Sequence, residues 1–233
     1  MELIQAGLIA QALLLLLKTS LGNEQTTSLG EPVIFVYPSK LNQEDELEEC
    51  TKNSVCGIYH RRKWFINKVQ QLCKCPNTDC PYTWDEGDVH LDNNSQLKIC
   101  SNISDLNICK EHEIGLRLTE EKEKRKQSDL KLDCNCPWPS YWQLTSHKAN
   151  TTFSYNEYSC TKWKRCERGE FCGHVRDDIH SLYIQCSCPK DHICVSTDRT
   201  LRNASEAFYS GPMLRAYCTP LNKPTTTEPS SRN

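Results

Sequence analysis

Hydrophobic and polar residues alternate along much of the chain, which is the pattern of β-strands with one buried face. The clearest case is the pair of segments 171–175 (FCGHV) and 181–188 (SLYIQCSC), which flank the polar stretch 176–180. Two such runs joined by a short polar connection predict a β-hairpin. The same pattern predicts two further hairpins, at 55–59 with 68–75 and at 113–118 with 130–136.

Each predicted hairpin ends in the motif Cys-x-Cys-Pro, at 73–76, 134–137 and 186–189. Side chains two apart on a strand share a face, so we expect both cysteines of the motif to face inward. The proline ends the strand because it has no N–H for the ladder. A third strand is expected before the last cysteine of each repeat, at 96–100, 153–160 and 213–218. The predicted fold class is a small disulfide-rich all-β protein, built from three consecutive three-stranded, cystine-clamped modules.

The composition supports cross-linking in place of one large core. The chain has 233 residues, of which 16 are cysteine and only 37% are hydrophobic. An even, high cysteine count is typical of secreted disulfide frameworks. A zinc site at 186–194 is the alternative, but zinc pairs usually have wider spacing, so we expect no metal and no cofactor. The net charge of −2 argues against binding nucleic acid.

The expected organisation follows from these segments. The apolar run 6–17 suits a signal peptide and is too short to span a bilayer; an uncleaved anchor is the alternative. No second apolar run occurs, so we expect a secreted protein without membrane insertion. We predict a signal peptide (1–22), a flexible segment (23–49), module 1 (50–100), module 2 (101–160), module 3 (161–218) and a disordered tail (219–233).

The cysteines divide into even sets, so each module can close its bonds internally. Module 1 has Cys50, Cys56, Cys73, Cys75, Cys80 and Cys100; module 2 has Cys109, Cys134, Cys136 and Cys160; module 3 has Cys166, Cys172, Cys186, Cys188, Cys194 and Cys218.

Module 2 lacks two cysteines, and a bond lost as a unit leaves no free thiol. Cys109 directly precedes the strand-like segment 110–118, as Cys56 and Cys172 lie at their strands, so we equate it with the second cysteine of the opening pair. The predicted bonds are then Cys50–Cys80 and Cys166–Cys194. If Cys109 matches the first, they are Cys56–Cys80 and Cys172–Cys194. The remaining pairings stay open.

Trp138, Tyr141 and Trp142 follow the middle motif, near the place of the missing bond. We suggest that aromatic burial replaces the lost cross-link there; the alternative is that one of the tryptophans is simply exposed on the surface.

Several surface features are candidates for function. Asn-x-Ser/Thr acceptors predict N-glycosylation in solvent-facing loops, at Asn93, Asn102, Asn150 and Asn203. The tip of the first hairpin carries Arg61, Arg62, Trp64 and Phe65, an aromatic and basic combination enriched at binding hot spots. We predict that these four residues contact a ligand; the alternative is that one aromatic folds back over the sheet. No catalytic motif occurs in the sequence, so we do not expect an enzyme.

The cysteine pattern resembles that of the Argos, or giant-lens, family of secreted arthropod antagonists of epidermal growth factor (EGF) receptor signalling. The resemblance lies in CSCPKDHIC (186–194) followed by YSGPMLRAYC (209–218), in CKCPNTDC (73–80) and in CNCPWPSYW (134–142). It implies three-finger-like modules and a protein that sequesters an EGF-like growth factor. We expect the protein to be a monomer. Two other functions stay open: a three-finger-like toxin or salivary protein acting on a receptor, channel or host factor, and an extracellular structural or adhesion module.

Overall fold

A computed structural model describes residues 24–26, 32–38, 46–121 and 129–221. This part of the chain is all-β, as the alternation predicts, with a short 3₁₀ helix, η2 (Ile103–Asp105), and no α-helix. No helix in the described residues is long and apolar enough to cross a membrane. The strands are β1 (Glu24–Thr26), β2 (Pro32–Val36), β3 (Val55–His60), β4 (Asn67–Gln71), β5 (Val89–Asp92), β6 (Ser95–Ile99), β7 (Ile114–Glu121), β8 (Asp129–Leu132), β9 (Ser140–Ala149), β10 (Phe153–Lys162), β11 (Lys164–Arg165), β12 (Phe171–Arg176), β13 (Leu182–Ile184), β14 (Cys186–Ser187), β15 (His192–Val195), β16 (Arg202–Glu206) and β17 (Tyr209–Pro220).

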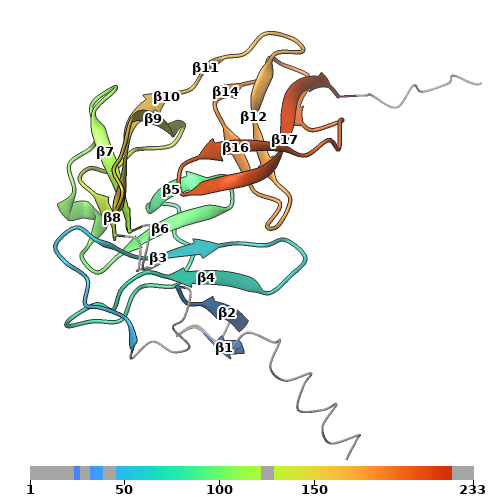
Figure 1. Cartoon of the computed structure of the whole chain (residues 1–233). Coiled ribbons are helices and arrows are strands. Elements are labelled where there is room, and N and C mark those ends of the chain that lie inside the picture. The colour runs from blue at the N-terminus through green and yellow to red at the C-terminus, as the bar shows by residue number, and fades with distance from the viewer. Residues whose placement is uncertain (1–23, 27–31, 39–45, 122–128, 222–233) are drawn as a thin grey trace, which may run out of the picture.

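The strands form three main sheets. The first sheet has the order β1-β2-β4-β3-β6-β5, and the second sheet has the order β8-β7-β10-β9. The third sheet has the order β13-β12-β17-β15, with β16 also paired to β17, and β11 and β14 form a separate parallel pair. Figure 1 shows the first sheet at the base, the second at the left and the third at the upper right.

The three sheets repeat one arrangement. Each contains a predicted hairpin, β3–β4, β7–β8 or β12–β13, whose first strand also pairs with the last strand of the sheet, β6, β10 or β17. A further strand lies on the other side of that last strand: β5, β9 or β15. This further strand was not predicted, so the repeated unit has four strands and not three. On β9 the exposed and half-buried positions do not alternate regularly, which explains why the pattern missed it.

The segment predicted to be flexible, 23–49, contains two strands, so that prediction is wrong for β1 and β2. β2 pairs in parallel with β4, and Val33 and Phe35 are buried against Tyr59 and Val69. The physical reason is that the apolar run PVIFV adds a strand beside β4, where its inward side chains join the buried cluster of the first sheet. The predicted signal peptide and residues 222–233 of the predicted tail lie outside the described residues, while Thr219 and Pro220 belong to β17.

All sixteen cysteines lie in the described part of the chain, and none is free. The eight bonds are Cys50–Cys73, Cys56–Cys80, Cys75–Cys100, Cys109–Cys134, Cys136–Cys160, Cys166–Cys186, Cys172–Cys194 and Cys188–Cys218. The predictions Cys50–Cys80 and Cys166–Cys194 are therefore wrong, and the alternative pairing is confirmed.

The reason for this correction is that Cys109 is the first cysteine of its set. It bonds to Cys134, the first cysteine of the motif, just as Cys50 bonds to Cys73. The second opening cysteine, Cys56 or Cys172, sits at a β-bulge where the register with the last strand shifts. In the second sheet the same shift falls at Gly115, so glycine occupies the place of that cysteine.

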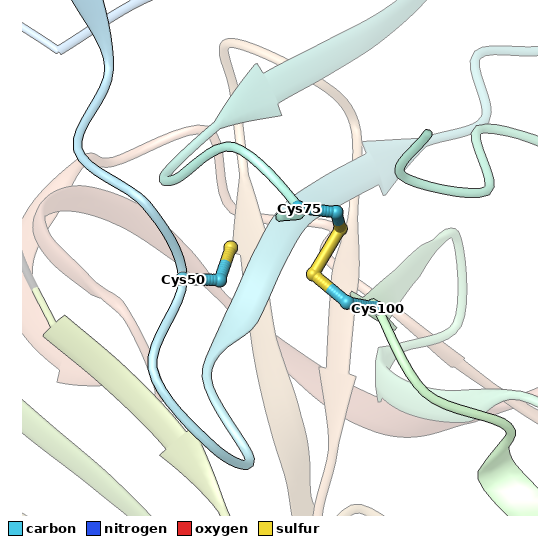
Figure 2. Close-up of side chains that lie close together, drawn as sticks. All are labelled: Cys50, Cys75 and Cys100. Atoms are coloured by element: carbon cyan, nitrogen blue, oxygen red, sulfur yellow. A yellow bond between two sulfur atoms is a disulfide. The ribbon is translucent and has the colours of Figure 1, made fainter. Parts of the chain in front are cut away.

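The disulfides are packed against one another. Figure 2 shows the Cys75–Cys100 bond with the side chain of Cys50 beside it; the Sγ atoms of all three lie within 4.8 Å of one another. Cys166, Cys188 and Cys218 form the matching group in the third sheet. Such groups of sulfurs resemble a metal site, but each sulfur is already bonded in a disulfide.

One hydrophobic core connects all three sheets. It contains Val55 and Leu97 of the first sheet, Leu116 and Leu132 of the second, and Tyr183 and Met213 of the third. Neighbouring sheets therefore bury part of their apolar surface against each other. The sequence predicts three consecutive modules but not this sharing, because alternation reports which face is buried and not what covers it.

Candidate ligand-binding surface

The tip of the β3–β4 hairpin carries the two most exposed large hydrophobic side chains in the described residues. Trp64 is 81% exposed and Phe65 is 62% exposed. The base of the tip is held by Arg62, whose backbone N–H donates to Asn67 Oδ1 at 3.0 Å and whose Nε donates to the Ile66 carbonyl at 2.6 Å. The alternative that one aromatic folds back over the sheet is wrong. The tip thus presents both rings to solvent on a tethered loop.

The four residues predicted to contact a ligand do not form one patch. Arg62 lies near Phe65, with its guanidinium carbon 5.6 Å from the ring centroid. Arg61 instead stacks on Trp84, with its guanidinium carbon 3.8 Å from that ring. The structure therefore groups Arg62, Trp64 and Phe65 and places Arg61 against a different aromatic side chain.

Beside the tip lies a hollow of about 330 Å³ that the third sheet helps to form. Arg62, Trp64 and Phe65 line one side, and Asp178, Ile179 and His180, from the β12–β13 turn, line the other. Asn93 and Asn94, from the β5–β6 turn, complete it. Two turns that are far apart in the sequence thus enlarge the surface that the aromatic tip offers to a partner.

Polar contacts fix these turns relative to each other. The Asn93 Oδ1 accepts from the Leu182 N–H at 2.7 Å, and the Asn94 Nδ2 donates to the His180 carbonyl at 3.4 Å. Ser181 Oγ donates to Asp92, and burial raises the pKa of the Asp92 carboxyl while the hydrogen bond from Ser181 opposes that rise. A buried hydrogen-bonded network of this kind holds a single arrangement.

His60, on β3, is buried near this contact between the first and third sheets. Its Nδ1 is 2.7 Å from Ser95 Oγ. Burial lowers the pKa of His60 to about 3, and the charges of Arg176 and Lys68 act in the same direction. The imidazole is therefore neutral throughout the physiological range, so His60 adds no charge to the contact between the first and third sheets.

A second and larger hollow, the inter-sheet cleft, separates the second and third sheets. Its volume is about 720 Å³, and it lies between the face of β7, β9 and β10 and the β16–β17 hairpin. The hairpin tip closes its base, because Ala207 is buried in the shared core and accepts a hydrogen bond from the Tyr183 hydroxyl at 3.2 Å. Its walls include five large aromatic side chains, Tyr141, Trp142, Tyr158, Phe208 and Tyr209, among polar residues.

A series of stacked rings fixes the second sheet against the first. Trp84 packs edge-on to His90, with ring centroids 5.4 Å apart, and His90 lies 5.3 Å from the ring of Trp138. The indole N–H of Trp142 donates to the His90 carbonyl at 3.1 Å. The walls of the inter-sheet cleft are therefore anchored to the rest of the molecule.

The predicted glycosylation sites differ in accessibility. Asn102, Asn150 and Asn203 are exposed, whereas Asn93 is half-buried at the contact with Leu182. Glycan attachment stays a prediction at all four positions. The exposures favour the first three, because a glycan needs a solvent-facing side chain.

Sequence reasoning found the aromatic tip but missed the inter-sheet cleft. The tip is a local signal, since aromatic and basic residues adjoin in a short polar connection. The cleft residues come from five strands and two sheets, and no spacing in the sequence brings them together. Six consecutive residues, SEAFYS at 205–210, line it, and nothing in that segment alone predicts a cleft.

No protein-family model matches the chain. Among solved structures, the chain is similar to one described as the crystal structure of unliganded Argos, with a TM-score of 0.54 and 23% sequence identity. The similarity covers 80% of this chain and 97% of the Argos chain. At this identity the likeness concerns the fold, and it agrees with the resemblance in the cysteine pattern. The chain therefore has the disulfide-rich all-β fold of Argos.

Proposed function

We propose that this protein is a secreted binding protein that sequesters an EGF-like growth factor and so inhibits EGF receptor signalling. The observation that carries the proposal is the fold shared with Argos along nearly the whole of that chain. The proposal assigns no chemistry to the protein: its role is to hold a ligand away from the receptor.

The architecture supports a binding role. Disulfides brace each sheet and the shared core holds the three sheets together, which lowers the entropic cost of ordering a binding surface. The inter-sheet cleft of about 720 Å³ offers a concave, aromatic-lined surface to a partner. Sixteen paired cysteines also fit an oxidising, extracellular compartment.

The direct test uses the secreted, oxidised, full-length protein. Immobilised EGF-like growth factors should capture it, and adding it to responsive cells should lower receptor phosphorylation in proportion to the fraction of growth factor bound. Light scattering should report a monomer. If the protein bound none of the EGF-like domains in a broad panel, the proposal would be contradicted. The alternative functions, a toxin or a structural module, would then be tested.

The aromatic tip is proposed as part of the ligand contact. We expect the double substitution Trp64→Ala/Phe65→Ala to weaken growth-factor binding at least roughly tenfold, because exposed aromatic anchors carry much of the energy at interfaces. Leu201→Ala is the matched control, since Leu201 is also an exposed large hydrophobic residue but lies outside the tip. Equal affinities for the double variant and the control would remove the tip from the contact.

A further inference from the structure

The inter-sheet cleft carries negatively charged side chains in addition to aromatic ones. Glu120, at the end of β7, and Glu206, at the end of β16, both line it. The described residues that line the cleft also include one histidine, His147, but no lysine or arginine. The cleft therefore presents two carboxylates among aromatic rings, with no lysine or arginine among its lining residues to pair with them.

The more deeply placed carboxylate is held in position. The Glu206 side chain is only 8% exposed, and its Oε1 accepts from His174 Nδ1 at 2.6 Å and from Gln185 Nε2 at 2.9 Å. Glu120 is exposed at the opposite side of the cleft, where its Oε2 accepts from Ser154 Oγ at 3.3 Å. A charge fixed by such contacts needs little reorganisation when a ligand binds.

The tyrosines of the cleft respond to these charges. The pKa of Tyr158 is raised to about 12, mainly by burial, with the charges of Glu120 and Glu206 adding to the rise. The pKa of Tyr141 is also raised, first by burial and then by the charge of Glu206. Both tyrosines are thus neutral, and the negative electrostatic potential in the cleft comes from the two carboxylates, which favour a cation there.

We propose that the inter-sheet cleft is a subsite for a basic side chain, lysine or arginine, that the protein ligand inserts between the second and third sheets. A cation gains from the faces of aromatic rings and from carboxylates in a partly desolvated site. The fit is specific in charge: an acidic side chain would meet two like charges. The proposal rests on the proposed function, because it presumes a protein ligand.

A first experiment tests the chemistry without the growth factor. Nα-acetyl-arginine methylamide and its neutral isostere, Nα-acetyl-citrulline methylamide, are each titrated into isotopically labelled full-length protein and followed by NMR. We expect the arginine probe to shift amides at 141–144 and 206–209 and to bind roughly tenfold more tightly than the citrulline probe. Equal shifts with both probes, or shifts that lie elsewhere, would overturn the subsite.

A second experiment uses a growth factor that the wild-type protein binds. We expect Glu120→Gln/Glu206→Gln to weaken that binding roughly 30-fold, because removing one partner of a desolvated charge pair leaves the ligand cation unpaired. The salt dependence of binding should fall as well. Glu121→Gln is the matched control, since Glu121 neighbours Glu120 on β7 but does not line the cleft.

The outcomes separate this inference from the proposed function. Undiminished binding by the double glutamine variant, with a native circular dichroism spectrum, would overturn the subsite and leave growth-factor sequestration standing. Failure of the wild-type protein to bind any growth factor would overturn the proposed function, while the arginine and citrulline titrations would still decide whether the cleft accepts a cation.

Discussion

The second and third sheets solve the same packing problem in different ways. In the third sheet, Cys194 on β15 lies opposite Cys218 on β17 and bonds to Cys172 at the bulge of β12. In the second sheet, Trp142 on β9 lies opposite Cys160 on β10, at the position that matches Cys194. Gly115 occupies the bulge. A tryptophan and a glycine therefore stand where the third sheet has a disulfide.

Steric constraints explain why the glycine and the tryptophan occur together. A Cβ added at Gly115 would lie 2.6 Å from Cys134 Sγ, 2.9 Å from Cys109 Sγ and 3.1 Å from the Trp142 ring. The indole thus fills the space beside the bulge, and only glycine leaves room for it. Of the predicted aromatic replacements for the lost bond, Trp142 is buried as expected, whereas Trp138 is 48% exposed. The comparison teaches that packing can occupy the place of a covalent link.

The largest expected effect comes from removing the indole. Trp142→Ala should lower the free energy of unfolding by about 4 kcal/mol, because it leaves a cavity in the shared core and deletes the hydrogen bond to His90. Guanidinium denaturation of the oxidised protein measures this. A loss below about 1 kcal/mol would show that Trp142 does not replace the missing bond.

A double substitution sharpens the same comparison. Gly115→Cys/Trp142→Cys should form a ninth disulfide, since the two positions match Cys172 and Cys194. Intact mass after alkylation under non-reducing conditions checks this. Two alkylated thiols would show that the second sheet does not share the backbone geometry of the third.

The next largest expected effect comes from removing the disulfide that stands at this place in the first sheet. Cys56→Ala/Cys80→Ala should cost about 3 kcal/mol, since that bond closes a chain segment with a sequence separation of 24 residues. The cost should therefore be similar to that of removing Trp142. The same denaturation experiment gives the value, with the double alanine variant of Cys172 and Cys194 as the parallel case. A negligible cost in both would show that the neighbouring disulfides already hold these sheets.

A smaller effect is expected at the glycine itself. Gly115→Ala should cost roughly 2 kcal/mol, because the new methyl group must displace two sulfur atoms and the indole. Gly87→Ala is the control, since a Cβ there meets only the Asp85 side chain. Equal stabilities of the two variants would mean that the space beside Trp142 is not filled.

The smallest expected effect concerns His60, at the polar contact between the first and third sheets. It is a change in stability with pH, which the indole contact of the second sheet does not produce. Since the pKa of His60 is lowered from 6.5 to about 3, its contribution to stability is present above pH 6.5 and is lost as the pH falls from 6.5 toward 3. Between pH 7 and pH 5.5 the loss should be about 1 kcal/mol. It should disappear in His60→Gln and persist in His112→Gln, an exposed control. An unchanged pH profile in His60→Gln would refute the assignment.

The sequence determined the local features of this protein. Alternation placed the three hairpins, because strand periodicity is a property of short segments. The prediction that the proline of Cys-x-Cys-Pro ends the second strand of each hairpin is wrong, since β4, β8 and β13 each end two residues before the first cysteine of the motif. The even cysteine sets predicted pairing within segments, and no bond in the structure joins one set to another. The boundaries of the three modules stay a prediction, since the sheets share a core. The aromatic tip was visible for the same local reason.

Only the tertiary structure decided how these parts meet. The bulge at Gly115 showed that Cys109 is the first cysteine of its set, which counting alone left open. The parallel pairing of β2 with β4 and the inter-sheet cleft depend on contacts between segments far apart in the chain. Alternation states which side chains turn inward, whereas the identity of the covering surface depends on how all three sheets close over one core.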